Sequence, residues 1–309
     1  MSHMEIEVPP RRVAAVRRVP PLAALQIERA GKPRGAARWR RKLAKAAFRL
    51  VHQRLGVPAK GEIVIDPDGR AIPFAADFAN TAYIDFAQRS AEGSYEPEVT
   101  ALFDRLAPAA RVVYDIGANW GYYVAVLLSN PRFRGRVHAF EIAPATCAAL
   151  ARLAAACGGG RVECHAFGLS DRSGTAAIAE GMHSALTRIT AGAGRPARIE
   201  PLDALGLADP DLVKVDVEGH EAQVFAGARR TLARARPAIV FESWFAEPAS
   251  RAALAALAEL GYRFHRLDWR AGRLLLAPLA PGARDDVARA LNLLALHPDG
   301  PAAIAALLA

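Results

Sequence analysis

The run Val-Val-Tyr-Asp-Ile-Gly-Ala-Asn-Trp-Gly at residues 112–121 constrains the fold more than any other part of the chain. Its three leading residues predict a buried strand, Asp115 follows them, and the glycines predict a tight turn into a helix. Gly117 and Gly121 let the backbone approach a ligand closely, and the start of the next helix offers free N–H groups. The run therefore predicts a ligand site at the end of a buried strand in an α/β fold.

The spacing of the acid and the glycines indicates which ligand this turn suits. The pattern is Asp-x-Gly-x-x-x-Gly, whereas nicotinamide and flavin enzymes use Gly-x-Gly-x-x-Gly to seat a pyrophosphate. S-adenosylmethionine (SAM) has no phosphate, but it carries a cationic sulfonium and an ammonium group. Because the carboxylate of Asp115 suits such a cation, the run predicts a SAM site. An ordinary strand-to-helix turn is the alternative.

A second apolar strand, Leu-Val-Lys-Val-Asp-Val-Glu-Gly-His-Glu at residues 212–221, also ends in an acid-rich turn. With this run the chain resembles the FkbM-type family of SAM-dependent O-methyltransferases, over roughly residues 90 to 300. Asp216–Glu221 is the most specific matching piece. The other pieces follow the family's order and are Tyr95–Glu98, Asp115–Asn119 with Gly121–Tyr123, Phe140–Glu141, Leu169–Asp171 and Phe241–Glu242.

The resemblance implies a class I methyltransferase fold, which is a Rossmann-like, doubly wound, mostly parallel sheet of seven strands. The hydrophobic pattern agrees, because predicted strands and helices alternate along the chain. The strands expected are 111–115, 136–141, 161–166, 212–216, 238–242 and 262–268, and the helices expected are 121–129, 144–156, 220–234 and 248–260. Extra strands are expected at 175–179 and 197–201, around a glycine-rich loop at 181–195. Either 273–277 or 291–296 could form the closing strand, and the second better resembles the closing segment of the family.

The first 90 residues are expected to form a basic extension ahead of a methyltransferase domain at 91–309. Residues 11–54 hold 14 Lys and Arg against the single acid Glu28, a net charge of +13, so the basicity of the chain, whose net charge is +9, comes from this segment. Irregular chain is expected up to residue 35, apart from a short helix at 22–30. An amphipathic basic helix at 36–55 and a hairpin at 62–74 are expected to follow, and 78–107 is expected to be mostly helical.

The basic helix has three interpretations: packing on the core with its charges solvated, binding to an anionic membrane surface, or binding to nucleic acid or another acidic partner. The three cysteines make no disulfide framework, and no apolar run reaches the length of a membrane span. We therefore expect a cytoplasmic protein. The basic helix suggests, as an alternative, a peripheral position at the inner membrane surface. The sequence leaves the oligomeric state open.

Cofactor contacts are assigned to residues at the strand ends. The first turn, through the family resemblance, wraps the methionine part of SAM, and a carboxylate at Glu141 can accept both ribose hydroxyls. The resemblance also implies that the loop after the third strand lies at the adenine, and that Tyr95 and Glu96 lie over the cofactor. The expected cofactor residues are Tyr95, Glu96, Asp115, Gly117, Ala118, Asn119, Gly121, Glu141, Ile142, Gly168, Leu169, Asp171 and Asp216. The alternatives are a surface acid at Glu141, a turn former at Asp171 and a helix start at Tyr95 and Glu96.

Methyl transfer to a hydroxyl needs alignment of the acceptor and removal of its proton, for which a neutral histidine or a carboxylate is suited. His220 is favoured as the base, with Asp216 as its orienting group or the alternative base, and Glu242 as a third catalytic candidate. Glu218, His220, Glu242 and Trp244 are expected to contact the substrate. A helix start at His220, a salt bridge at Glu242 and core packing at Trp244 are the alternatives. Asp216, Glu218 and Glu242 offer oxygens to a divalent metal, but no spacing requires one, and none is expected.

The expected reaction converts SAM to S-adenosylhomocysteine and methylates a hydroxyl, with a sugar in a surface glycan or lipid-linked saccharide preferred as the acceptor. A polyketide or other natural-product scaffold is the second acceptor class. A base-modifying nucleic-acid enzyme is disfavoured, because the fourth strand ends in Asp-Val-Glu-Gly-His and not in the Asn/Asp-Pro-Pro-aromatic motif. The alternative to an enzyme is a non-catalytic scaffold that binds SAM or associates with a membrane. The variable loops 181–195 and 243–250, which would select the acceptor, do not identify it.

Overall fold

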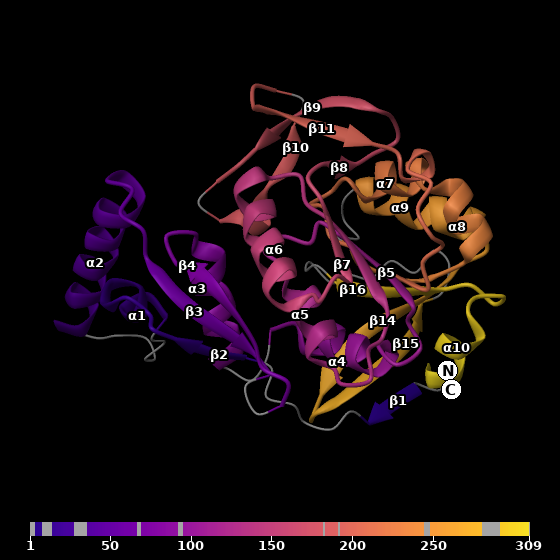
Figure 1. Ribbon diagram of the computed structural model, residues 1–309, viewed down its shortest axis with the longest axis horizontal. Helices are drawn as coiled ribbons and strands as arrows, with labels where there is room; N and C mark the ends of the chain where they lie inside the picture. The colour runs from indigo at the N-terminus through magenta and orange to yellow at the C-terminus, as the bar shows by residue number, and fades with distance from the viewer. Residues whose placement is uncertain are drawn as a thin grey trace. The chain divides into compact units, whose positions relative to one another are not determined.

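The computed structural model describes residues 4–7, 14–27, 36–66, 69–91, 95–181, 183–190, 192–243, 248–279 and 291–308. The chain forms two compact units (Figure 1). One unit, here the catalytic unit, comprises Met1–Pro10, Glu96–Glu180 and Thr187–Ala309. The other, here the N-terminal unit, comprises Arg11–Tyr95 and Gly181–Leu186. The division differs from the expected extension at 1–90, because the first strand joins the large sheet and part of the glycine-rich loop joins the N-terminal unit.

A nine-stranded sheet with the order β1-β15-β14-β16-β13-β12-β5-β6-β7 is the centre of the catalytic unit. Its strands are β1 (Met4–Glu7), β5 (Val112–Ile116), β6 (Arg136–Phe140), β7 (Val162–His165), β12 (Leu212–Val215), β13 (Ala238–Ser243), β14 (Arg263–Arg270), β15 (Arg273–Leu279) and β16 (Leu291–Leu296). The run from β7 to β13 is parallel throughout, and β16 lies antiparallel between β13 and β14. The doubly wound, mostly parallel fold is confirmed, with two further strands, β15 and β1, beyond the expected seven.

The order of the strands reverses beside β5, which has β6 on one side and β12 on the other. Such a switch point leaves a crevice outside the carboxyl ends of the strands, where open α/β sheets bind ligands. The sheet lies between two groups of helices in Figure 1. These are α4 (Pro97–Leu106), α5 (Tyr122–Ser129) and α6 (Pro144–Cys157) in one group, and α7 (Glu221–Gly227), α8 (Arg229–Ala235) and α9 (Pro248–Glu259) in the other.

The central strands form where the sequence is mostly apolar, as is usual for strands covered on both faces, with Asp115 in β5 and Lys214 in β12 as the charged exceptions. All four residues of β12 are buried, and so are four of the five in β5. Apolar residues of α7, α8 and α9 pack over one face of these strands, with Phe225 and Leu257 among the most deeply buried. This packing holds the strand ends in place and thereby positions the polar residues that follow them.

Three expectations for the catalytic unit are refined by the structure. The helix expected at 220–234 is divided at Ala228 into α7 and α8. Both candidates for the closing strand are strands, as β15 and β16. The loop expected at 181–195 contains a short strand, which joins a separate four-stranded sheet. That sheet has the order β10-β9-β11-β8 and consists of β8 (Gly168–Leu169), β9 (Gly174–Ala179), β10 (Arg188–Thr190) and β11 (Arg195–Glu200).

The N-terminal unit is a three-stranded sheet with helices. The expected hairpin is present, and an additional strand pairs with it, so this region is more regular than expected. Its elements are β2 (Ala14–Arg17), β3 (Lys60–Ile65), β4 (Ile72–Asp77), α1 (Pro21–Ile27), α2 (Ala36–Phe48), the π-helical turn η1 (Arg49–Arg54) and α3 (Thr81–Ala91). Buried aromatic contacts such as Phe78 against Tyr83 hold it together.

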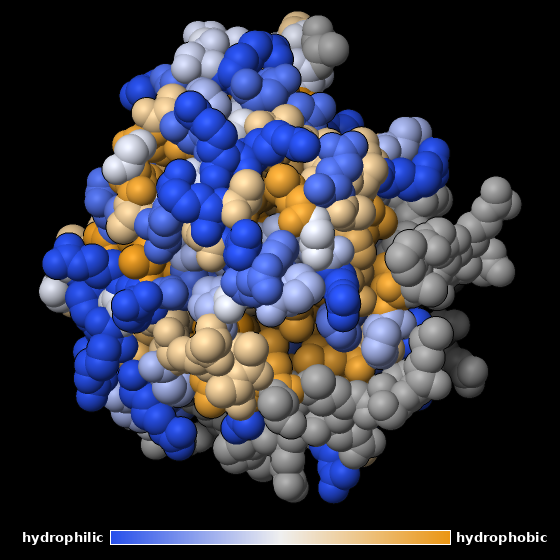
Figure 2. Space-filling view, turned by 90° about the vertical axis from the view of Figure 1, so that its right-hand side faces the viewer, coloured by the Kyte–Doolittle hydropathy of each residue, from blue (hydrophilic) through white to orange (hydrophobic). Residues whose placement is uncertain are grey.

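The predicted basic helix forms as α2 and η1, and its apolar stripe is largely exposed. Trp39 and Leu43 are each 67% exposed, whereas Phe48 is buried. No helix among the described residues is long and apolar enough to cross a membrane. Elsewhere on the surface, hydrophilic side chains are interspersed with apolar ones, as on the face drawn in Figure 2.

Candidate active site

Four parallel neighbours of the large sheet end in or next to a carboxylate at the same edge. Asp115 is the penultimate residue of β5, Glu141 follows β6, Asp216 follows β12, and Glu242 is the penultimate residue of β13. Because parallel strands end at a common edge, the fold gathers these four acids from positions far apart in the chain. The edge is the one at which the sequence placed the ligand.

Gly117 is the residue that allows the β5 turn to press against the neighbouring strand. Its φ is +79°, and a Cβ there would lie 1.8 Å from the carbonyl oxygen of Asp216. No other residue type fits that space, and the left-handed backbone also favours glycine. The N–H groups of Gly117 and Ala118 donate to the carbonyl oxygen of Phe140 at 3.0 and 2.9 Å. The turn is thus fixed against both β6 and β12.

Glu141 ties this turn to the start of α6. One carboxylate oxygen accepts from the Asn119 N–H at 2.8 Å, and the other from the Ala143 N–H at 2.7 Å. Burial raises the pKa of Glu141 to about 7, although both backbone donors act to lower it. Each oxygen keeps a further lone pair for a ligand hydroxyl, so the geometry suits the ribose contact predicted for this residue. Ile142, which follows it, lies against Gly168.

Lys214 is a functional residue that the sequence reasoning missed. It is 2% exposed, and its Nζ lies 2.7 Å from Oδ2 of Asp216 and 4.8 Å from the centre of the Tyr123 ring. Burial acts to lower the pKa of Lys214, but the carboxylates of Asp216, Glu96 and Asp115 outweigh it and raise the pKa. The signal was visible in the sequence, because a lysine within an apolar strand, two residues before an acid, needs a buried partner.

Asp115 is 1% exposed, and its Oδ2 has no hydrogen-bond partner among the described residues. Burial raises the pKa of this carboxyl to about 7, with a further contribution from Asp216 and an opposing one from Lys214. A buried carboxylate oxygen without a donor is costly to leave unsatisfied. A cationic ligand would satisfy it, so this oxygen fits the charged groups of a sulfonium-containing amino acid.

Asp216, Glu218 and Glu242 bring carboxylate oxygens within 4.8 Å of one another. Burial and the charge of Asp216 raise the pKa of Glu218 to about 7 and that of Glu242 to about 8. Carboxylates this close share a proton readily or hold a hard divalent cation. From the sequence these three acids were weighed as metal ligands and no metal was expected; the structure shows that the acids do converge.

Glu96 joins the same group from the start of α4. It has a left-handed backbone with φ of 42°, accepts a hydrogen bond from the Tyr123 hydroxyl, and is surrounded by the charges of Lys214 and Asp216. Burial raises the pKa of Glu96, and Lys214 and Tyr123 act to lower it. Tyr95, its neighbour, belongs to the N-terminal unit, where it packs against Phe86. The cofactor contact of Tyr95 stays a prediction.

His220 lies directly before α7 and faces the loop after β8. Its Nε2 is 2.9 Å from the Ser170 hydroxyl, which in turn donates to Asp171 at 3.1 Å. Because the serine has one proton and gives it to Asp171, the imidazole donates from Nε2, and the lone pair of the neutral ring is at Nδ1. Burial lowers the pKa of His220, so the ring is neutral at pH 7. Trp244, predicted to contact substrate, lies outside the described residues.

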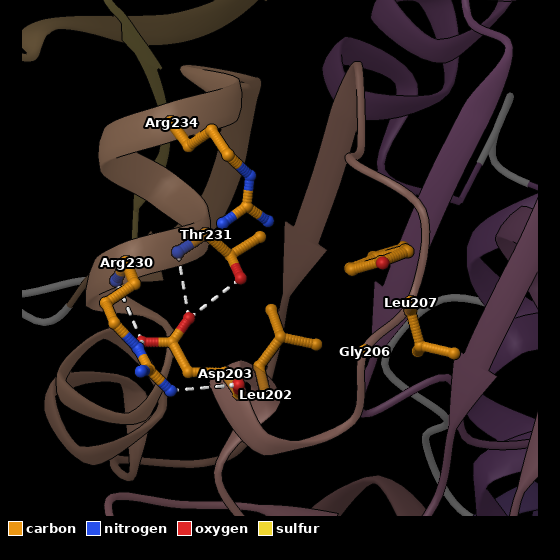
Figure 3. Close-up of a pocket in the computed structure, with 8 residues that line it drawn as sticks. Leu202, Asp203, Gly206, Leu207, Arg230, Thr231 and Arg234 are labelled. Atoms are coloured by element: carbon orange, nitrogen blue, oxygen red, sulfur yellow. Dashed lines mark hydrogen bonds and ion pairs between the residues drawn. The ribbon is translucent and has the colours of Figure 1, made fainter.

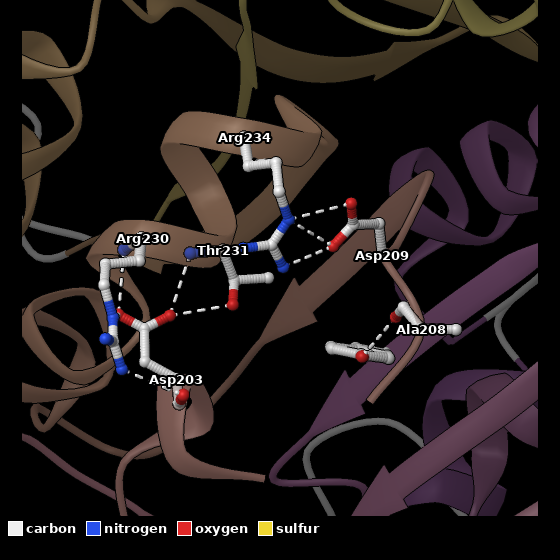
Figure 4. A network of polar contacts seen from close by, with 7 residues as sticks. Asp203, Ala208, Asp209, Arg230, Thr231 and Arg234 are labelled. Atoms are coloured by element: carbon white, nitrogen blue, oxygen red, sulfur yellow. Dashed lines mark hydrogen bonds and ion pairs between the residues drawn. The ribbon is translucent and has the colours of Figure 1, made fainter. Parts of the chain in front are cut away.

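A cavity of about 270 Å³ lies apart from the strand-end carboxylates, between α8 and the segment before β12 (Figure 3). The charged residues that line it are already in ion pairs, Arg230 with Asp203 and Arg234 with the nearby Asp209. Asp203 accepts hydrogen bonds from the backbone of Arg230 and Thr231, and Arg234 pairs with Asp209 at 2.5 Å (Figure 4). The paired charges give this cavity no free group for methyl-transfer chemistry.

The known proteins to which this chain is similar are methyltransferases. Residues 115–264 match the family model described as the methyltransferase FkbM domain. A search of the curated proteins finds no match. A methyltransferase FkbM structure from Methylobacillus flagellatus KT is 17% identical with a TM-score of 0.41, and the match covers 77% of this chain and 60% of that one.

Two other solved structures show similar levels of similarity. The O-methyltransferase TomG from Streptomyces achromogenes, solved with SAM, is 17% identical with a TM-score of 0.42, over 71% of this chain and 87% of that one. Precorrin-6y C5,15-methyltransferase from Geobacter metallireducens GS-15 is 16% identical with a TM-score of 0.39, over 64% and 88%. The family match spans all four strand-end acids described above. The chain therefore carries a methyltransferase domain of the FkbM family at residues 115–264.

Proposed function

We propose that the protein is a SAM-dependent O-methyltransferase whose acceptor is a hydroxyl, preferentially of a sugar in a surface glycan or lipid-linked saccharide. The observation that carries the proposal is the buried, unsatisfied Oδ2 of Asp115 at an edge rich in carboxylates. An edge of this charge attracts a cationic ligand, as the sulfonium and ammonium of SAM require. When bound, SAM supplies an electrophilic methyl group for in-line displacement by the acceptor oxygen.

The residues at the strand ends divide the work of holding this cofactor. Asp115 faces its cationic amino-acid part, with the turn at Gly117 allowing close approach. Glu141, held by two backbone donors, accepts from the ribose. The loop after β8, with Leu169 and Asp171, receives the adenine. Asp216, fixed by Lys214, lies at the point where the methyl group is transferred.

The affinity for SAM is expected to rise with pH. Asp115 and Glu141 each have a pKa raised to about 7, so at pH 6 they hold protons that a cationic ligand must displace. Each linked proton makes the affinity rise about tenfold between pH 6 and 8, so the two together give up to about 100-fold, and the affinity levels off above that range. Calorimetry in buffers of different ionisation enthalpy would measure both the affinity and the proton release. An affinity that is constant from pH 6 to 9 would remove these carboxyls from the binding step.

The proton acceptor for the substrate hydroxyl is best placed among the converging carboxylates. Glu242 has a pKa raised to about 8, close to the value that serves a base at neutral pH. His220, favoured from the sequence, is committed through Nε2 to Ser170, although its Nδ1 carries a lone pair. We therefore propose Glu242 as the base, Asp216 as the group that orients the acceptor, and His220 as the alternative base.

Replacing His220 by alanine separates its two roles. If His220 orders the loop at Ser170, H220A weakens SAM binding, because the hydrogen bond that anchors that loop is lost. If His220 is the base, turnover falls by about 10²–10⁴-fold while SAM binding is kept. Our proposal predicts the first result, with less than about a tenfold loss in turnover at saturating SAM. Equilibrium binding and single-turnover rates on the same variant distinguish them, and S170A serves as the matched variant on the other side of the hydrogen bond.

The acceptor class is tested by incubating the pure protein with methyl-labelled SAM and a fractionated extract of its host. Label in polymeric or lipid-linked carbohydrate, stable to mild base as an ether, supports the proposal. Label in a small apolar metabolite favours the natural-product alternative. SAM binding without label in any fraction favours a non-catalytic SAM-binding scaffold.

The basic helix α2 suits an anionic membrane surface, which would place the protein near a lipid-linked acceptor. Trp39 and Leu43 are exposed on a helix that also carries Lys42 and Lys45, the arrangement of an interfacial helix. Replacing both Trp39 and Leu43 by serine is expected to reduce binding to phosphatidylglycerol vesicles by about tenfold or more, because the inserted apolar surface is lost. Co-sedimentation measures this, with L186S, an exposed leucine elsewhere, as the control. Equal binding by both variants would assign the helix to a different role.

A further inference from the structure

A second group of ligating side chains lies in the catalytic unit, on one face of β6 and β7, and includes none of the strand-end carboxylates. His138 is in β6, and Glu163 and His165 are in the neighbouring edge strand β7. His138 is directly opposite Glu163 in the parallel register, and Glu163 and His165 are two residues apart, so all three point to the same face of the sheet. Two imidazoles and one carboxylate form a common ligand set for divalent transition metals.

Four candidate ligand atoms, one nitrogen from each histidine and both carboxylate oxygens of Glu163, are spaced as the ligands of a small metal ion are. Nδ1 of His138 lies 3.2 Å from Nε2 of His165 and 3.4 Å from Oε2 of Glu163. Nε2 of His165 lies 3.8 Å from Oε1 of Glu163. Bonds of about 2.0–2.1 Å in a tetrahedron place ligand atoms about 3.3 Å apart. The observed separations are within about 0.5 Å of that value, so small side-chain rotations would complete the site.

The two imidazoles are held in place by aromatic neighbours. The His165 ring stacks on Phe140 with centroids 4.4 Å apart and an interplanar angle of 15°. The Tyr114 ring meets the His138 ring edge-on, at 5.3 Å and 83°. Both histidines have a pKa lowered first by burial, so they are neutral at pH 7 and have lone pairs to donate. Glu163 is exposed, with 62% of its side chain accessible, which gives an ion a way in from solvent.

We propose that His138, Glu163 and His165 bind one divalent transition-metal ion of the zinc class, with water completing the coordination. The ion would tie the edge strand β7 to β6, just ahead of the loop that begins at Phe167 and leads into β8. This site is independent of the proposed methyl transfer, because none of its three ligands belongs to the strand-end group. The same short distances would arise from a hydrogen bond between two neutral imidazoles, and metal titration distinguishes the two cases.

The test is titration of the tag-free, chelator-treated protein with Co²⁺, followed by its visible absorption. We expect one equivalent to bind with the intense absorption of a four-coordinate site and to be displaced by Zn²⁺. H138Q and H165Q should each weaken this binding by more than about tenfold, since even a second-shell partner of a metal is worth about 10–100-fold. E163Q changes an exposed side chain, so it should leave folding intact, and it should weaken Co²⁺ binding by a similar factor.

Two control variants make the outcome decisive. H297Q removes a histidine from another part of the catalytic unit and should bind Co²⁺ as the wild type does. E242Q alters the other converging group, Asp216, Glu218 and Glu242, and should also leave the signal unchanged. Loss of the signal in E242Q, its persistence in H138Q, H165Q and E163Q, or absence of stoichiometric binding in the wild type would each overturn the proposal.

Discussion

Replacing Lys214 by methionine is expected to lower the free energy of unfolding by about 3–5 kcal/mol at pH 7.5, which is the cost of breaking a buried ion pair from one side. The side chain is 2% exposed and lies 2.7 Å from Asp216, with the acids Glu96 and Asp115 also acting on it. Methionine fills a similar volume but leaves these carboxylates without their cation. Urea denaturation followed by circular dichroism measures the loss.

The sign of the pH dependence follows from the raised pKa of Lys214. A lysine whose pKa is higher in the folded state contributes its full stabilisation below the unfolded value of about 10.4 and loses it only above that pH. The contribution is therefore complete at pH 7.5. The difference between K214M and wild type should shrink at acidic pH, because protonation of Asp115 and Glu96, whose pKa values are raised, removes the uncompensated charges.

The exposed pair of Arg229 and Glu259, 3.1 Å apart, is the control for this experiment. R229M breaks an ion pair in solvent and should cost less than about 1 kcal/mol. If K214M were as stable as R229M, the stability of the fold would not depend on the charge of Lys214, and the ion-pair role given to this lysine among Asp216, Glu96 and Asp115 would be wrong.

Replacing Glu242 by glutamine is expected to lower turnover by about 10²–10⁴-fold while SAM binding changes little, because the proposed base is removed and the shape of the side chain is kept. Wild-type turnover should rise with pH, reach half of its maximum near pH 8 and level off about one pH unit higher, following the pKa of about 8 for this carboxyl. In E242Q that rise should be absent. Rates at saturating SAM between pH 6 and 9 test both points.

E259Q is the matched control, since Glu259 is an exposed glutamate on α9. It should retain wild-type turnover and the wild-type pH profile. If E242Q kept turnover within about threefold of wild type, the base would lie elsewhere, and His220 or Asp216 would take its place in the proposal.

Much of the fold could be predicted because its signals are local. The mostly apolar runs at β5 and β12, and the glycine turn at Gly117, each depend on a few adjacent residues. The resemblance placed the acids at the strand ends, and parallel strands bring such ends to one edge. The approximate location of the site therefore follows from local sequence patterns and the topology that they imply.

Other features depend on residues that are distant in the sequence. The insertion of β16 between β13 and β14, and the addition of β1 to the sheet edge, are set by which strands pair, and pairing leaves no local mark. The turn of His220 toward Ser170 was missed for the same reason. His138 and His165 carry no local signal of a shared site, because they lie on two different strands and become neighbours only when β6 pairs with β7.

The doubly wound α/β class could be predicted from the chain's own residues, since hydrophobic period and glycine spacing are encoded locally. The resemblance to the FkbM-type family added the roles of the acids at the strand ends. Only the tertiary structure decided which of those acids meet, which stays unsatisfied, and that Lys214 lies among them. The physical reason is that burial and electrostatic coupling depend on distances between strands, and those distances exist only once the sheet has assembled.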